Sequence, residues 1–402
     1  MSLPAPHRPA LARAADLWDR LGRGLGLRRD WLTPEALEED AARMTGLSDF
    51  GPDDYREGLE VFCRSLARDA HLDVVGRAVV RSFLRRILGN RLLLVEHRKH
   101  APAPVELVRP LIVMGLPRTG TTHLHRLLAQ DPAAHGPPAW TLWRPLPRLE
   151  GPDRRREITI QALEGMRTLS PELDSKHYQE ADEPEECYHL LDPSFRAPGL
   201  TMLCQARSYW EWVRGQDMRP AYRMYREYLE ILQASAPGKR LTLKTPLHTP
   251  YLEEILEVIP DACFVQTHRD VVEVAGSMAS LAHSMFAVTS PRVDPIQLGE
   301  LVMDLLRWLA EATLAQREAR ELPVVDVAYR DLLADPVGTV GRIHEVHGLP
   351  FTAEVEAAVR AGAERRPQHR KGTHRYELAD FGLSEARVRE ALAPYVERFL
   401  GA

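Results

Sequence analysis

The segment Gly115-Leu-Pro-Arg-Thr-Gly-Thr-Thr122 has the residue types and the spacing of a phosphate-binding loop. It follows the apolar run 111–114 and leads into a stretch of helical character, 123–130. In a strand–loop–helix unit of this kind, consecutive backbone N–H groups and the helix N-terminus converge on an anion. The loop therefore predicts a site for a phosphate or a chemically similar group.

One residue of this loop departs from the pattern of ATP-binding loops. The spacing of Gly115 and Gly120 fits the first half of that pattern, but Thr121 stands where a lysine follows the second glycine. The cation of the loop is Arg118 instead. Because the missing lysine serves the β- and γ-phosphates of ATP, the loop favours another ligand, and a sulfuryl group is the leading candidate.

Other polar residues stand directly after short apolar runs. Lys244 ends one such run, Arg269 follows another, and Ser277 lies eight residues beyond Arg269. In an open α/β sheet, ligands bind beyond the carboxyl ends of the strands. Cations and a hydroxyl at these positions indicate a ligand with two separate anionic groups. The alternative for each cation is a surface salt bridge, which Arg269 would make with Asp270.

The elements that would position these residues alternate between strands and helices from residue 110 onward. Four short runs that are apolar on both faces form the expected strands: 111–114, 240–244, 263–267 and 324–327. Four stretches that follow them form the expected helices: 123–130, 250–258, 271–280 and 336–346. Strands of this kind suit a parallel sheet between helices. The pattern predicts a P-loop-like, doubly wound α/β fold.

The first part of the chain, residues 1–105, is expected to form a separate helical region. Apolar residues recur at helical spacing in three stretches: 11–27, 53–66 and 72–94. Thr33 and Pro34 have the residue types of a helix start. We expect this region to form a cap and, in a homo-oligomer, the contact surface. The α/β domain then covers residues 106–402.

Within that domain, residues 140–238 are expected to form a mainly helical insertion. The insertion holds four of the seven tryptophans: Trp140, Trp143, Trp210 and Trp212. It also holds six tyrosines: Tyr178, Tyr188, Tyr209, Tyr222, Tyr225 and Tyr228. Aromatic walls suit a pocket for an organic acceptor. Any single ring has the simpler role of packing helices onto the sheet.

Composition bounds the function classes. The chain has 402 residues, of which 44% are hydrophobic and 27% charged, as in an ordinary globular protein. Its formal net charge of −5 argues against a general nucleic-acid binder. The four cysteines lack metal-binding spacing and indicate reduced thiols in a cytoplasmic protein. We find no signal-peptide pattern and expect no membrane span.

The quoted motifs together resemble those of sulfotransferases that use 3′-phosphoadenosine 5′-phosphosulfate (PAPS). The loop 115–122 is similar to their 5′-phosphosulfate-binding loop, which implies that Arg118, Thr119, Gly120, Thr121 and Thr122 bind the donor. The segment 267–277 resembles their 3′-phosphate motif, with Arg269 and Ser277 at the matching positions. Lys244 matches the lysine that the bacterial and tyrosylprotein branches hold near the transferring group.

Two further segments extend this resemblance toward the C-terminus. The stretch 327–336 is similar to the family segment whose tyrosine, here Tyr329, lies near the adenine. Arg370, Lys371 and Gly372 match a segment of the cytosolic branch that closes over the 3′-phosphate. The alternative for these residues is a solvated basic loop.

The resemblance implies sulfuryl transfer to a hydroxyl group of a small organic acceptor. Arg118, Lys244 and the backbone N–H groups of 119–122 would supply the positive field. We expect no metal, because the chain has no evident carboxylate pattern of an Mg²⁺ site. The alternatives are a non-catalytic nucleotide-binding relative and, third, a kinase on a degenerate P-loop.

The general base is where the chain departs from its relatives. They often carry a carboxylate after a tryptophan about twenty residues past the loop, but here Thr141 follows Trp140. Our first candidate is His248, four residues beyond Lys244, because histidine titrates near neutral pH. The alternative is the acidic run 180–186, with Asp182 and Glu183 as candidates.

Overall fold

The core of the protein is a five-stranded parallel sheet. The computed structural model describes residues 14, 16, 17, 31–100, 104–319, 322–365 and 377–401. Its strands are β1 (Leu111–Gly115), β2 (Ala134–His135), β3 (Arg240–Lys244), β4 (Cys263–His268) and β5 (Val324–Ala328), in the order β2-β3-β1-β4-β5. The four expected strands are confirmed to within one residue at each end. The two-residue β2 was not expected.

Alternate residues of the strands feed two different cores. Leu111 and Val113 of β1 pack with Val265 of β4 and with the helices of one face, whereas Ile112 and Met114 pack into the opposite core. Both faces of the sheet are therefore covered, which explains why the strands are apolar throughout.

The described helices that follow β1, apart from those between β2 and β3, are α5 (Thr121–Leu128), α11 (Leu252–Val258), α12 (Val271–Thr289), α13 (Pro295–Ala319), α14 (Tyr329–Ala334), α15 (Pro336–Val346), α16 (Ala353–Arg365), α17 (Glu385–Ala391) and α18 (Ala393–Phe399).

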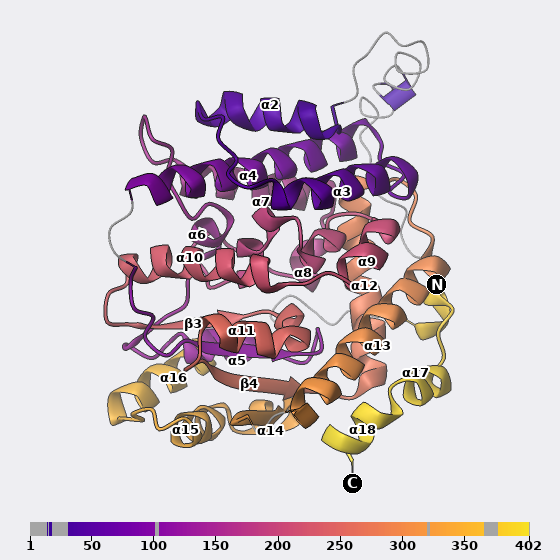
Figure 1. Ribbon diagram of the computed structural model, residues 1–402. Coiled ribbons are helices and arrows are strands. Elements are labelled where there is room, and N and C mark those ends of the chain that lie inside the picture. The colour runs from indigo at the N-terminus through magenta and orange to yellow at the C-terminus, as the bar shows by residue number, and fades with distance from the viewer. Residues whose placement is uncertain are drawn as a thin grey trace.

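The segment between β2 and β3 is helical, as expected. It contains α6 (Ala139–Trp143), α7 (Arg155–Leu169), α8 (Leu173–Lys176), α9 (Arg207–Val213) and α10 (Arg219–Ser235). Three short 3₁₀ turns lie among them: η2 (Cys187–Leu190), η3 (Asp192–Ser194) and η4 (Pro198–Met202). A fourth, η5 (Pro246–Tyr251), follows β3. In Figure 1 this segment lies between the N-terminal helices and the sheet.

The N-terminal part forms α2 (Pro34–Thr45), η1 (Asp53–Tyr55), α3 (Arg56–Arg68) and α4 (Val74–His100). Thr33 caps α2 as expected, since its hydroxyl accepts from the Ala36 N–H at 3.3 Å. These helices share one apolar core with the 140–238 segment. The expected helix over 11–27 falls mostly outside the described residues. The last described 3₁₀ turn is η6 (Leu378–Phe381).

Helix α12 is a long and strongly apolar helix. Its length and composition pass a simple test for a membrane-spanning helix, but 78% of its apolar window is buried inside the protein. It packs against α13, α4 and α17 as a core helix. Helix α12 extends nine residues beyond the expected end at Ser280, to Thr289.

Candidate functional site

The turn that joins β1 to α5 is shaped by two glycines. Gly115 has φ 135°, and a Cβ there would meet the carbonyl oxygen of Thr267 at 2.4 Å. Gly120 has φ 94°, and a Cβ there would meet the ring of Tyr329 at 2.6 Å. Only glycine fits both positions without strain. Helix α5 begins at Thr121, so its N-terminal N–H groups face the end of the sheet, as an anion site requires.

Arg118 takes an uncommon backbone conformation within this turn. Its φ is 68°, a value that few residues other than glycine adopt. Its Nε donates to the Ser277 hydroxyl at 2.9 Å, and its carbonyl oxygen accepts from Arg269 Nη1 at 3.3 Å. The loop residue and the two residues expected at the 3′-phosphate are thus held together. Strain of this kind is concentrated at functional sites.

Arg269 is oriented by a second contact. Its guanidinium lies over the Tyr329 ring, with Cζ 4.5 Å from the ring centroid, and it pairs with Glu273 in the first turn of α12. The expected alternative partner, Asp270, instead caps α12 and pairs with Arg389. Arg269 and Tyr329 therefore place a cation and an aromatic ring against each other beside the loop.

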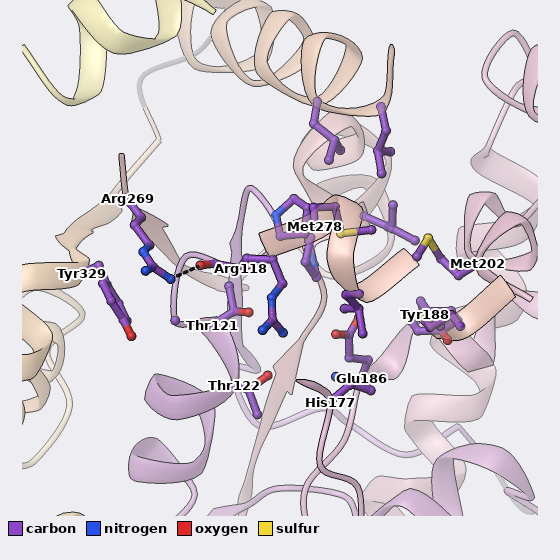
Figure 2. Close-up of a pocket in the computed structure, with 18 residues that line it drawn as sticks. Arg118, Thr121, Thr122, His177, Glu186, Tyr188, Met202, Arg269, Met278 and Tyr329 are labelled. Carbon is purple, nitrogen blue, oxygen red and sulfur yellow. Dashed lines mark hydrogen bonds between the residues drawn. The ribbon is translucent and has the colours of Figure 1, made fainter. Parts of the chain in front are cut away.

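A cavity of about 220 Å³ opens beside the loop. This volume is many times the ~10–15 Å³ that one water molecule needs, so it can hold an organic ligand. Its polar end is lined by Arg118, Gly120, Thr121, Thr122, Arg269 and Tyr329. Its other end is apolar, with Met202, Met278, Leu281, Met285, Leu305 and Leu309. Figure 2 shows Arg269 and Tyr329 at one side and Met202 and Tyr188 at the other.

Between the two ends lies a carboxylate paired with the strand-end lysine. Lys244 Nζ is 2.8 Å from Glu186 Oε1 and 3.8 Å from Glu185 Oε1. The Thr245 hydroxyl donates to Glu186 Oε2 at 3.2 Å. Lys244 is fully buried, whereas the Glu186 side chain keeps 18% of its surface exposed and lines the cavity. Among the described residues that line the cavity, Glu186 is the only carboxylate.

His177 and Glu185 complete the buried charge cluster around this pair. Burial lowers the pKa of His177, whose ring lines the cavity 4.0 Å from the Glu185 carboxylate. For Glu185, burial acts to raise the pKa, but Lys244 and then His177 outweigh it and bring the value to about 2. Glu185 therefore stays ionised and helps to balance the charge of Lys244.

The structure places His248, the first candidate for the base, away from the cavity. Its ring is fully buried, with Nδ1 2.8 Å from the Tyr222 hydroxyl and Nε2 3.3 Å from the Cys187 thiol and 3.2 Å from the Tyr225 hydroxyl. Burial lowers the pKa of His248 to about 3. A side chain with these partners, and without contact to the cavity, packs and hydrogen-bonds; it does not face an acceptor.

The two acidic alternatives also lie elsewhere. Asp182 is half-exposed and forms an ion pair with Arg156 on α7. Glu183 lies 3.8 Å from Arg126, and neither carboxylate lines the cavity. Another member of the same acidic run, Glu186, does line the cavity. Thr141, the residue that replaces the usual carboxylate, donates to the Pro138 carbonyl.

The remaining expected donor-binding residues divide into three groups. Thr121 and Thr122 line the cavity. Thr119 is fully buried, and its hydroxyl is used inside the loop, 2.6 Å from both the Leu116 carbonyl and the Thr267 hydroxyl, so only its backbone N–H is left for a ligand. Arg370, Lys371 and Gly372 lie outside the described residues.

The apolar end of the cavity differs from what the sequence suggested. Of the ten aromatic residues expected around an acceptor, Tyr188 alone lines the cavity among the described residues. Most of the others, such as Tyr209 and Tyr222, are buried between helices. The wall is instead built by methionines and leucines, most of them on α12 and α13. The sequence carried no signal for this, because an apolar helix face looks the same whether it meets a core or a cavity.

The described parts of the chain contain no group of three or more His, Cys, Asp or Glu residues arranged to hold a metal ion. All four cysteines are free and buried, as their spacing suggested.

Comparison with known proteins agrees with this geometry. Residues 110–353, more than half of the chain, match the model of a family described as "Sulfotransferase family". The chain belongs to the sulfotransferase family. This match begins one residue before β1 and ends at the start of α16, so it includes the loop, Lys244, Glu186 and Arg269.

Two solved structures of mycobacterial sulfotransferases resemble this chain. The sulfotransferase STF1 of Mycobacterium tuberculosis H37Rv is 35% identical, with a TM-score of 0.77 over 91% of this chain and 100% of that one. STF9 of Mycobacterium avium is 29% identical, with a TM-score of 0.80 over 92% of this chain and 97% of that one. Both support the α/β sulfotransferase fold.

A curated relative carries a substrate in its name. The omega-hydroxy-beta-dihydromenaquinone-9 sulfotransferase Stf3 of Mycobacterium bovis is 28% identical over 253 residues, which are 60% of this chain. The chain spans 63% of the length of that relative.

Proposed function

We propose that this protein transfers a sulfuryl group from PAPS to a hydroxyl group of a small organic acceptor. The observation that carries the proposal is the cavity itself. One end has the cations and N–H groups for a phosphorylated donor, and the other end is apolar. Glu186 lines the cavity between them and is paired with Lys244, which is buried directly behind it. A transferase needs this order, because donor and acceptor must meet in line at the reacting group.

The donor would lie along the polar end. The backbone N–H groups of 119–122 and the Arg118 guanidinium would hold the 5′-phosphosulfate. Arg269 and Ser277, which both contact Arg118, would hold the 3′-phosphate, and the Tyr329 ring would meet the adenine. Arg370, Lys371 and Gly372 stay predictions for the same phosphate. The chemistry needs positive charge rather than a metal, and Arg118 and Lys244 supply it.

The reaction then needs a base for the acceptor hydroxyl, and we assign this role to Glu186 in place of His248. The acceptor oxygen attacks sulfur, forming one S–O bond, while the S–O bond to the 5′-phosphate breaks. Its electron pair leaves with the phosphate oxygen, which yields adenosine 3′,5′-bisphosphate. Glu186 takes the hydroxyl proton. Lys244 stabilises the charge that develops around the transferring group.

The relatives support this reading in different degrees. STF1 and STF9 are named as sulfotransferases and match along most of this chain. Stf3 is named for a hydroxyl-bearing menaquinone derivative, which is consistent with an organic alcohol as acceptor. A non-catalytic nucleotide-binding protein would not need a solvent-accessible carboxylate beside the buried lysine. A kinase is disfavoured by Thr121.

Ligand-dependent melting separates these alternatives. Adenosine 3′,5′-bisphosphate should raise the melting temperature in a concentration-dependent way, and AMP, which lacks the 3′-phosphate, should do so much less. Stabilisation by Mg-ATP that exceeded stabilisation by the bisphosphate would overturn the assignment. Turnover of PAPS over a panel of hydroxyl acceptors then separates an enzyme from a binding protein.

One substitution tests the 3′-phosphate assignment. Arg269→Ala removes a charge-assisted contact worth about 1.5–3 kcal/mol, so the bisphosphate dissociation constant should rise by roughly one to two orders of magnitude. Arg330→Ala is the matched control, because Arg330 lies on α14 beside Tyr329 but its side chain is 90% exposed. If the two variants bound the bisphosphate equally well, Arg269 would stabilise the loop without binding the 3′-phosphate.

A further inference from the structure

The apolar end of the cavity carries information on the acceptor. Met278, Leu281 and Met285 come from α12, and Leu305 and Leu309 come from α13, so two long helices supply most of this wall. Both helices belong to one buried apolar cluster. The wall is therefore a rigid pair of helices faced with side chains that adapt their shape, since methionine is unbranched and flexible.

Polar partners are scarce at this end. Of the described residues there, the Tyr188 side chain alone carries a hydrogen-bonding group, and burial raises the pKa of its hydroxyl so that the group stays neutral. A second polar group on the acceptor would lose its hydration without finding a partner, which costs about 1–3 kcal/mol. Charged groups would lose more. The reacting hydroxyl itself would meet Glu186 at the boundary between the two ends.

From this lining we propose that the acceptor is an uncharged alcohol whose body is apolar, and not a sugar or a peptide. The inference rests on the proposed function and names its substrate class. Thioether and aliphatic side chains bury alkyl surface without directional demands, so an alkyl chain gains affinity with its length. Burial of one methylene group contributes about 0.8 kcal/mol, which corresponds to about a fourfold gain in affinity.

A chain-length series tests the proposal. With PAPS as donor, kcat/KM should rise about fourfold for each added methylene from 1-butanol to 1-octanol, until the cavity is filled. Glucose and a tyrosine-containing peptide should react at least tenfold less well than 1-octanol. A flat series, or a preference for glucose or the peptide, would overturn the apolar-acceptor assignment while leaving sulfuryl transfer intact.

Variants at the apolar end add a measurement that does not need turnover. Met202→Gln and Met285→Gln keep side-chain size but place an amide in the wall. Both should weaken the binding of 1-octanol to the bisphosphate complex at least tenfold by calorimetry, with the bisphosphate affinity unchanged. Met166→Gln on α7, outside the cavity, is the matched control.

The two proposals fail in different ways. Unchanged 1-octanol binding in Met202→Gln and Met285→Gln would overturn the acceptor class. Loss of 1-octanol binding in these variants would support it even if no alcohol were sulfated. In that case the proposed reaction would be the one overturned.

Discussion

The contacts of Glu186 are the strongest evidence on how the proposed transfer would remove the acceptor proton. Its carboxylate has one oxygen against a buried lysine and the other against a threonine hydroxyl, yet it still reaches the cavity. A carboxylate held in this way is positioned to receive a proton without rotating. The lysine that fixes it, Lys244, is also the group that would stabilise the transferring sulfuryl.

The first prediction tests Glu186 as the base. Glu186→Gln keeps the shape of the side chain but cannot accept the hydroxyl proton, so kcat should fall by about 10²–10⁴-fold. The dissociation constant of adenosine 3′,5′-bisphosphate should change little. Steady-state kinetics with PAPS and calorimetry with the bisphosphate measure the two quantities.

Two variants serve as controls for this prediction. Glu183→Gln lies in the same acidic run but outside the cavity and should retain activity. His177 is a second group among the described lining residues that could accept a proton near Glu186. If His177→Gln lost turnover while Glu186→Gln kept it, the proton would pass to the histidine and our assignment would be wrong.

The second prediction concerns the pH dependence that His248 brings to stability. The unfolded chain protonates this histidine near pH 6.5, whereas burial brings its folded pKa to about 3. The folded state therefore binds fewer protons, and stability should fall as the pH drops from about 6.5 toward 3. Above pH 6.5 the histidine is neutral in both states, so the protein keeps its full stability there.

His248→Gln should make this acid-side loss of stability smaller. At pH 7.5 the same variant should be less stable by about 1–3 kcal/mol, because the hydroxyl of Tyr222 and the thiol of Cys187 lose a well-placed partner. Urea unfolding between pH 4 and 8 measures both effects. The rate profile between pH 5 and 8 should keep its shape, and loss of a neutral ionisation would instead restore His248 as the base.

At the scale of elements, sequence patterns were most informative where burial dictates residue type. Strands β1, β3, β4 and β5 were predictable because a sheet covered on both faces needs unbroken apolar runs. Two residues, as in β2, are too few to form a pattern. Helix α12 was predicted too short. Its second half is as apolar as its first, and no stop signal lies near Ser280, so the sequence pattern did not define where the helix ends.

The sequence could indicate only the part of the candidate site that local chain geometry assembles. Arg118, Arg269 and Tyr329 meet because each directly follows a strand, and the three strands are neighbours in the sheet. Glu186 was missed because an acidic run normally indicates a solvated surface, and only the fold brings one of its members against Lys244. The burial of His248 away from the cavity was unpredictable for a related reason: the intrinsic pKa of a side chain does not reveal whether the fold buries it.

The third prediction belongs to the turn between β1 and α5. Gly120→Ala would add a Cβ 2.6 Å from the Tyr329 ring at a positive φ, so either the loop or the ring must move. Both line the donor end, and bisphosphate affinity should fall at least tenfold. Calorimetry measures this fall.

Gly238→Ala is the matched control for that substitution. Gly238 also has a positive φ, 73°, but a Cβ there meets nothing within 4 Å. Its variant carries the backbone strain without the contact and should leave bisphosphate affinity unchanged. If both variants bound the bisphosphate normally, the Gly120–Tyr329 contact would have no part in donor binding.

On the scale of the whole molecule, the N-terminal helices are built into the fold. Arg91 of α4 is almost fully buried and donates to the carbonyl oxygens of Phe50, Pro52 and Pro193. Helix α4 also packs against α12, the helix that carries much of the apolar end of the cavity (Figure 1). We therefore expect that the stability of the N-terminal helices and the shape of the apolar end of the cavity are linked.

The last prediction uses a glycine at that contact. A Cβ on Gly76 would lie 1.7 Å from the carbonyl oxygen of Thr289, the final residue of α12, so Gly76→Ala must push α4 and α12 apart. Overpacking of this kind costs about 1–3 kcal/mol in the free energy of unfolding, which chemical denaturation measures. Because α12 carries Met278 and Met285, the acceptor KM should rise more than the bisphosphate dissociation constant. Gly165→Ala in α7 is the control: its Cβ meets nothing within 4 Å, and replacing a helical glycine should stabilise the protein by about 0.5–1 kcal/mol. Equal stability of the two variants, or an unchanged acceptor KM in Gly76→Ala, would show that the N-terminal helices and the acceptor end are independent.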